Sequence, residues 1–130
     1  MSAPKPGDEW IAYLVDVLAP LGAVRARRFF GGHGFVVGDV QFAFVSQGTC
    51  YLRADAALAA ELESLGSEPF RYRTRLREVR VASYWSLPQA ELDDEEALVR
   101  WGARALRVAG AVRRKASPKA ARARRATPAR

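Results

Sequence analysis

The sequence has very few of the side chains from which catalytic and metal sites are usually built. Among its 130 residues there are one cysteine, Cys50, and one histidine, His33. A single cysteine cannot form an intramolecular disulfide, so the sequence does not point to an oxidising compartment. A structural zinc site needs about four cysteine or histidine ligands, and this chain offers two. We therefore expect no metal site, no cofactor and no catalytic residue.

Long apolar runs are also absent. No stretch approaches the length of a membrane span, and residues 1–7 lack the apolar core of a signal peptide. We therefore expect a cytoplasmic protein without a membrane partner. The composition, 49% hydrophobic and 27% charged, is ordinary for a globular domain, and 130 residues suffice for one core.

Acidic residues are lacking after residue 112, where basic residues are concentrated. The net charge is +7, yet residues 1–112 hold 13 basic and 14 acidic side chains. The basic residues of the last segment are Arg113, Arg114, Lys115, Lys119, Arg122, Arg124, Arg125 and Arg130. We therefore predict a domain over residues 8–112 and a disordered basic tail over residues 113–130. The tail could bind nucleic acid without reading its sequence, or could serve only solubility.

The order of apolar periods and turn residues predicts the fold class. The expected elements are a helix at 8–19, strands at 24–30, 34–37, 40–45 and 49–53, a helix at 55–66, strands at 70–73 and 79–86, and a helix from 93 or 94 to 112. This order predicts an α+β fold of two layers, in which the helices pack on one antiparallel sheet.

A glycine-rich segment joins the first two expected strands: Arg27-Arg28-Phe29-Phe30-Gly31-Gly32-His33-Gly34. Glycines let an anion or another backbone approach closely, and paired arginines can clamp a phosphate or carboxylate. The candidate anion-binding or partner-binding residues are Arg27, Arg28, Gly31, Gly32 and His33. The alternative is a structural hairpin with solvated arginines. The glycine spacing fits neither a P-loop nor a dinucleotide-binding turn.

Strand alternation predicts the faces on which the histidine and the cysteine lie. Turns at residues 38–39 and 47–48 would pair Phe35 with Phe42 and Phe44 with Tyr51. His33 would then share the face of these aromatic residues, and Cys50 would lie on the opposite face. On this basis we do not expect a Cys-His catalytic pair.

A second basic cluster surrounds the last two expected strands and contains Arg71, Arg73, Arg75, Arg77 and Arg80. The first four alternate along the chain, so in an extended strand they would share one face. Such charges often protect an edge strand from aggregation. With Tyr72 and Trp85 nearby, they could instead form a surface for a partner or for nucleic acid.

An ordered series of motifs resembles the N-terminal domain of the TfoX/Sxy family of competence regulators. The glycine segment is similar to the family's Arg-Arg-Met-Phe-Gly-Gly sequence, with Phe29 where methionine is usual. The further matching segments are Val40-Gln41-Phe42-Ala43-Phe44-Val45, Gly48-Thr49-Cys50-Tyr51-Leu52-Arg53, Glu68-Pro69-Phe70-Arg71-Tyr72 and Ala82-Ser83-Tyr84-Trp85-Ser86-Leu87-Pro88. The resemblance covers roughly residues 8 to 112.

The resemblance implies a two-layer α-β-β-β-α-β-β-α fold, which is shared with secretion-chaperone-like proteins. It also implies a link to competence genes, in which TfoX-like proteins work alongside the cyclic-AMP receptor protein. The family's regulators carry a second, helical domain after this one, whereas a basic tail follows here.

We therefore expect a non-enzymatic regulatory or adaptor domain that acts through a protein partner in transcription. Its basic tail would add non-specific affinity for nucleic acid. The alternative is a small-anion-binding protein or an enzyme that uses Arg27, Arg28 and the turn at residues 31–34. The oligomeric state stays open, and a homodimer is compatible with the sequence.

Overall fold

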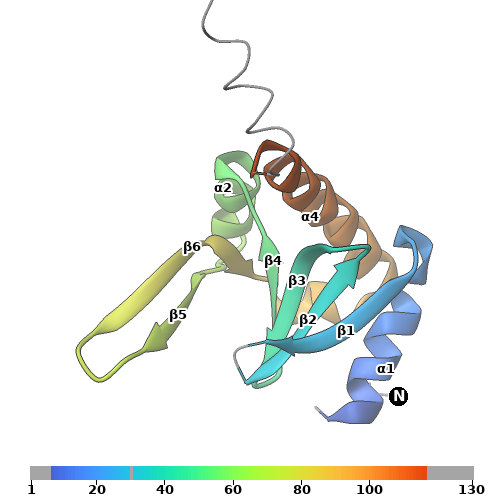
Figure 1. Ribbon diagram of the computed structural model, residues 1–130, viewed down its shortest axis with the longest axis horizontal. Helices are drawn as coiled ribbons and strands as arrows, with labels where there is room; N and C mark the ends of the chain where they lie inside the picture. Colours follow the sequence, from blue (N-terminus) through green and yellow to red (C-terminus); the bar gives the residue numbers. More distant parts are fainter. Residues whose placement is uncertain (1–6, 30, 117–130) are drawn as a thin grey trace, which may run out of the picture.

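Six antiparallel strands form one open sheet, and the helices lie on one of its sides (Figure 1). The structure, a computed structural model, describes residues 7–29 and 31–116. Its elements are α1 (Asp8–Val17), the 3-10 helix η1 (Ala19–Leu21), β1 (Val24–Phe29), β2 (Gly32–Val37), β3 (Val40–Ser46), β4 (Thr49–Arg53), α2 (Ala56–Ser64), β5 (Pro69–Arg73), β6 (Glu78–Ser86), α3 (Gln89–Leu92) and α4 (Glu95–Ala116). The strand order is β1-β2-β3-β4-β6-β5. The predicted α+β class and the order of the predicted helices and strands are confirmed, and the short helices η1 and α3 are additional.

The main core lies between the sheet and the helices. The apolar stripe of α1 buries Trp10 and Leu14 there, and α2 contributes Leu62. From the sheet, Phe42 and Leu52 are completely buried in the same cluster. Burial of each large apolar side chain stabilises the fold by about 1.5–3 kcal/mol. None of the helices in the described part of the chain has the length and apolar character needed to cross a membrane.

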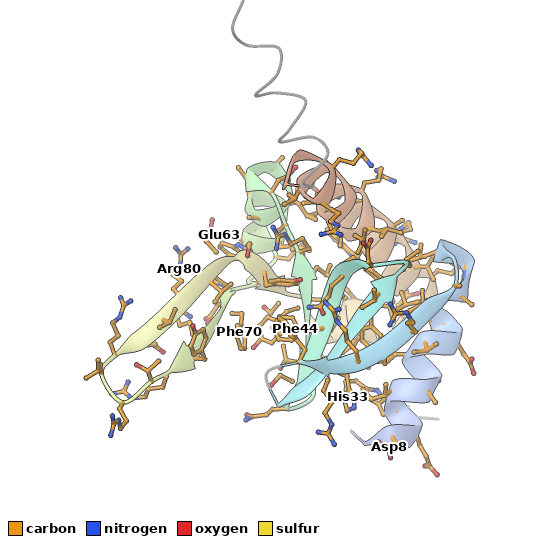
Figure 2. All side chains as sticks on the ribbon, in the orientation of Figure 1. Asp8, His33, Phe44, Glu63, Phe70 and Arg80 are labelled. Carbon is orange, nitrogen blue, oxygen red and sulfur yellow. The ribbon has the colours of Figure 1, made fainter. Side chains whose placement is uncertain are left out.

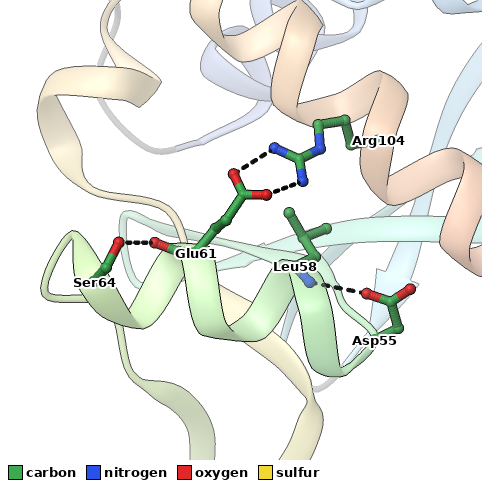
Figure 3. Close-up of polar contacts among 5 residues, drawn as sticks. All are labelled: Asp55, Leu58, Glu61, Ser64 and Arg104. Carbon is green, nitrogen blue, oxygen red and sulfur yellow. Dashed lines mark hydrogen bonds and ion pairs between the residues drawn. The ribbon is translucent and has the colours of Figure 1, made fainter.

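Helix α2 is capped at its N-terminus by Asp55, the residue before it, and is tied to α4 by an ion pair (Figure 3). The side chain of Asp55 accepts a hydrogen bond from the backbone N–H of Leu58 at 2.9 Å, as the sequence predicts. The Glu61 carboxylate accepts two hydrogen bonds from the Arg104 guanidinium, at 2.8 and 2.5 Å. These bonds lower the pKa of Glu61 from its ordinary value.

A β-bulge changes the predicted register in the middle of the sheet. The pairs Val37–Val40 and Phe44–Tyr51 form as predicted, but Phe35 pairs with Ala43 and not with Phe42. Phe42 is the extra residue of β3, and it packs in the main core. A bulge of this kind interrupts the strict alternation of faces along a strand.

The bulge overturns the predicted placement of His33. His33 pairs with Val45, which in turn pairs with Cys50, so these three side chains share the helix-covered face. Phe44 and Tyr51 lie on the other face. His33 and Cys50 are separated by two strand spacings, which is about 10 Å.

The last helix is longer than predicted. Helix α4 continues to Ala116, so Arg113, Arg114 and Lys115 belong to a helix and not to a disordered tail that begins at residue 113. Arg113 donates a hydrogen bond to the Asp39 carboxylate at 2.6 Å and thereby ties the end of α4 to the β2–β3 turn. The remaining predicted tail cations, Lys119, Arg122, Arg124, Arg125 and Arg130, lie outside the described residues.

Candidate functional site

The side of the sheet away from the helices carries a cluster of aromatic residues, which we call the aromatic face. All of its members come from strands, and they are the aromatic residues Phe29, Phe44, Tyr51, Phe70, Tyr72 and Tyr84 together with Val81. Phe44 is at its centre with no exposed surface, and the ring centroids of Phe29, Phe70 and Tyr84 lie 4.9 Å from its own. Edge-to-face pairs at such distances are favourable arrangements of aromatic rings.

The aromatic face lies in an angle of the sheet, which bends between its two halves. Figure 1 shows the β5–β6 hairpin projecting away from strands β1 to β4. The register between β5 and β6 shifts at Pro69 and Phe70, and a shift of this kind bends and twists a strand pair. Figure 2 shows Phe70 and Phe44 meeting in the angle between the hairpin and the rest of the sheet. The aromatic rings therefore shield one another from solvent, although none of the described helices covers this side of the sheet.

An arginine-lined pocket adjoins the aromatic face at the end of the sheet nearest the β2–β3 turn. Its volume is ≈ 340 Å³, and β1, β4 and α4 contribute Arg27, Arg53 and Arg113 to its lining. Arg27 donates from Nε to the Gln41 side-chain oxygen at 3.1 Å, and Gln41 donates from Nε2 to the Tyr84 hydroxyl at 3.3 Å. These bonds join three strands across the pocket.

The other two pocket arginines are also held in place. The Arg53 guanidinium lies over the Tyr84 ring, 5.5 Å from its centroid, and Arg113 pairs with Asp39. Cation–π contacts hold a guanidinium in position without neutralising its charge. The pocket therefore carries more positive than negative charge and is suited to an anionic group.

Local backbone conformation and close packing explain why glycine occupies the positions of the predicted anion-binding turn. Gly31 has a φ of 73°, a conformation that residues with a Cβ rarely adopt. A Cβ at Gly32 would overlap the carbonyl oxygen of Val45 in β3. A Cβ at Gly34 would overlap the Gln41 side chain and lie 2.6 Å from its Cδ. Gly34 thus leaves the room that Gln41 needs to reach Arg27.

The candidate residues of that turn do not converge on one site. Arg27 pairs with Gly34 and lies on the same side of the sheet as the aromatic face, whereas Arg28 pairs with His33 and lies on the helix-covered side. Arg27 and Arg28 are both exposed. The two arginines therefore cannot clamp one anion between them, and Arg27 belongs instead to the pocket with Arg53 and Arg113.

The second basic cluster is divided between a strand pair and a turn. Arg71 and Arg73 lie in β5, and Arg80 stands opposite Arg71 in β6, so these three share one face of the hairpin. Arg75 and Arg77 lie in the connecting turn, so the expectation that Arg71 to Arg77 share one strand face is wrong. The chain turns at Thr74 because its backbone N–H and its side-chain oxygen both bond to Arg77.

The only thiol of the chain is not placed for nucleophilic chemistry. Burial raises the pKa of the Cys50 thiol to about 12, so the reactive thiolate is scarce near neutral pH. Within the residues that the structure describes, no group of three or more His, Cys, Asp or Glu side chains could hold a metal ion.

Sequence reasoning missed most of the pocket. It singled out Arg27 but not Gln41, Arg53 or Tyr84, which lie on three different strands. One signal was present, since Gln41 is a polar residue within the apolar run from Val40 to Val45. A buried or half-buried amide needs hydrogen-bond partners, so its place in that run indicates a polar contact across the sheet.

The molecule is a small α+β domain whose sheet is covered by helices on one side and carries the aromatic face on the other. The chain belongs to the TfoX N-terminal domain family, which it matches over residues 16–109. This is a family of regulatory domains linked to competence. A search of curated proteins found no match to the chain.

Proposed function

We propose that this chain is a non-enzymatic regulatory domain that binds a protein partner through its aromatic face. The uncovered aromatic face carries this proposal. Half-buried Phe29, Tyr51, Tyr72 and Val81 surround a fully buried ring, Phe44, and no helix of the described chain contributes to the cluster. Tyrosine and arginine side chains around a buried centre are typical of the residues that dominate binding energy at protein interfaces.

The charges around this face define the partner's chemistry. Arg27 and Arg53 lie at one end of it, and Arg73 lines a groove of ≈ 370 Å³ with Tyr51 and Tyr72 at the other. A partner segment with apolar anchors and flanking acidic residues complements this surface. Membership of a competence-related regulatory family supports a partner in transcription as part of this proposal. Because the TfoX/Sxy resemblance implies work alongside the cyclic-AMP receptor protein, that protein is the first one to test.

Three further features belong to the same proposal. The domain works in the cytoplasm, and its basic C-terminal segment adds non-specific affinity for nucleic acid. A homodimer is compatible with this proposal if the dimer leaves the aromatic face accessible to the partner.

Site-specific photo-crosslinking in the native cell tests the proposal. A benzoylphenylalanine in place of Tyr72 reports on the aromatic face, and the same residue in place of Tyr13 is a matched aromatic control on α1. We expect a transcription protein to crosslink from position 72, with and without nuclease, and not from position 13. Tyr72→Ala should then weaken binding of the purified partner by more than tenfold. Crosslinks that need nucleic acid, or that are equal at both positions, would contradict the proposal.

A second candidate function is the binding of a small anion in the arginine-lined pocket. Three guanidinium groups line it, and among the described residues only Arg113 has a carboxylate partner there. Titration calorimetry with inorganic phosphate should detect binding that Arg53→Gln removes and that Arg100→Gln, an exposed control on α4, leaves unchanged. Equal heats for the two variants would exclude a site in this pocket.

A further inference from the structure

The tip of the β5–β6 hairpin presents the most exposed large apolar side chain of the described chain. Leu76 is 92% exposed, compared with 49% for Leu65 and 38% for Val112. The hairpin projects from the domain, so its tip lies away from the helices (Figure 1). A single exposed leucine needs no special explanation by itself. Leu76 differs from such a residue because it lies at the tip of a projecting hairpin and has arginines on both sides in the sequence.

The turn that carries Leu76 is held by a set of hydrogen bonds centred on Thr74. The Thr74 hydroxyl donates to the carbonyl oxygen of Arg77 at 3.0 Å, and the same hydroxyl oxygen accepts from the N–H groups of Leu76 and Arg77 at 3.2 and 3.1 Å. The Thr74 N–H donates to the Arg77 carbonyl at 2.8 Å. The leucine is therefore held outward by an ordered turn.

Positive charge surrounds this apolar tip. Residues 69–81 contain five arginines and one acid, Glu78. Arg71 pairs with Glu68, and the Arg80 guanidinium lies over the Trp85 ring at 5.8 Å from its centroid. The arginines nearest the tip are Arg73, Arg75 and Arg77; they are exposed and make no side-chain hydrogen bond or ion pair with a described residue. Their charges are available to an external anion.

We propose that this hairpin is a DNA-binding arm whose tip enters the minor groove of a duplex. The arginines would contact phosphates on both sides of the groove, and Leu76 would wedge against a base step. Proteins that bend DNA insert single apolar side chains in this way and place arginine in the minor groove. The arm's strands continue for about four residues behind the tip, roughly 13 Å, which exceeds the groove's depth of about 7.5 Å.

A membrane surface fits these features less well. Stable attachment to a bilayer needs more than one weak signal, and one leucine offers little apolar area. The arginines also extend back along the hairpin, from Arg77 at the tip to Arg71 and Arg80, and do not lie in one plane around it. Phosphates that follow a groove match such an arrangement. The strands of the arm contribute to the aromatic face, but Arg75, Leu76 and Arg77 at its tip do not. Changes at these three positions therefore test the arm separately from the proposed protein partner.

The test uses the full chain and a 30-base-pair duplex of unrelated sequence, with 2-aminopurine reporting unstacking and end labels reporting bending. Arg75→Gln/Arg77→Gln removes two charges from the arm, and Arg100→Gln/Arg107→Gln removes two exposed charges from α4 as a matched control. The arm variant should make the slope of log affinity against log salt less steep by about 2, since each phosphate contact contributes about 0.9. The control should leave it unchanged.

Leu76→Ala separates the wedge from the charges, and this exposed residue can be changed without disturbing the core. It should leave the salt slope unchanged, weaken duplex binding about 5- to 30-fold, and abolish both the 2-aminopurine signal and the bend. Equal salt slopes for the arm and control variants would show that the arm does not bind. Bending that survives Leu76→Ala would overturn the wedge. Binding to phosphatidylserine vesicles that is lost in the arm variant, with duplex binding intact, would assign the arm to membranes.

Discussion

The glycines at positions 31, 32 and 34 face three different surroundings, so alanine at each position should destabilise the domain by a different amount. A Cβ added at Gly31 would meet no atom within 4 Å, but the φ of 73° would remain. That conformation is unfavourable for alanine by about 1–2 kcal/mol, and the lower entropy of the unfolded chain offsets about 0.4–1 kcal/mol of it. We expect Gly31→Ala to reduce the free energy of unfolding by about 1 kcal/mol.

Gly32→Ala should be the most destabilising of the three substitutions. The new Cβ would overlap the carbonyl oxygen of Val45, which is a backbone atom of β3. Relief of this overlap requires a shift of the β2–β3 pairing, and overpacking of this kind typically destabilises by about 1–3 kcal/mol. Because the atom that must move is backbone, we expect a loss near the upper end, about 3 kcal/mol.

Gly34→Ala should be milder, because the atoms it meets are at the end of a flexible side chain. Gln41 can rotate away, at the loss of its hydrogen bonds to Arg27 and Tyr84, each of which contributes about 0.5–1.5 kcal/mol. Alanine recovers about 0.5–1 kcal/mol relative to glycine in a strand. The net loss should be about 1 kcal/mol, and it should disappear when the substitution is made in a Gln41→Ala background.

Urea unfolding of the single variants and of Gly34→Ala/Gln41→Ala measures these differences at equal m-value. Equal losses at positions 31 and 32 would refute the idea that close contact with β3 requires the second glycine. A loss at Gly34 that persists without Gln41 would refute its role in making room for that side chain. Variants that keep full stability but lose phosphate binding would instead assign the glycines to an anion site.

Three further predictions follow from the core, the buried thiol and the surface ion pair. Phe44→Ala should destabilise the fold by about 3–5 kcal/mol. Amide hydrogen exchange should increase first in the β5–β6 hairpin. An equal increase throughout the domain would show that Phe44 does not hold the hairpin against the sheet. Cys50, whose pKa is raised to about 12, should react with a disulfide reagent only at the rate of unfolding, and faster reaction would contradict its burial. Arg104 lowers the pKa of Glu61 in the folded protein. The stabilisation from this pair is therefore fully present above the pKa that Glu61 has in the unfolded chain, and it is lost as the pH falls through the lower pKa of the folded state. Glu61→Gln should therefore flatten the loss of stability below about pH 4, and an unchanged acid limb would contradict this.

Local sequence patterns determined the order of the helices and strands. The turns at residues 38–39 and 47–48, the cap at Asp55 and the apolar periods depend on residues only a few positions apart, and such interactions can be read along the chain. The motifs that indicate the TfoX N-terminal domain family are likewise runs of neighbouring residues. The basic clusters were visible for the same reason, although which cations are paired was not.

Tertiary packing decided the features that make a site. The bulge at Phe42 exchanged the faces of the β3 residues beyond it, and it places Phe42 and its neighbour Ala43 together in the main core, which strict alternation would not allow. Arg113, near the end of α4, bonds to Asp39, which is 74 positions away in the chain. The pocket of Arg27, Gln41 and Arg53 exists only where separate strands meet. Contacts between residues so far apart are chosen by the fit of the whole core, so the sequence pattern around each residue does not reveal them.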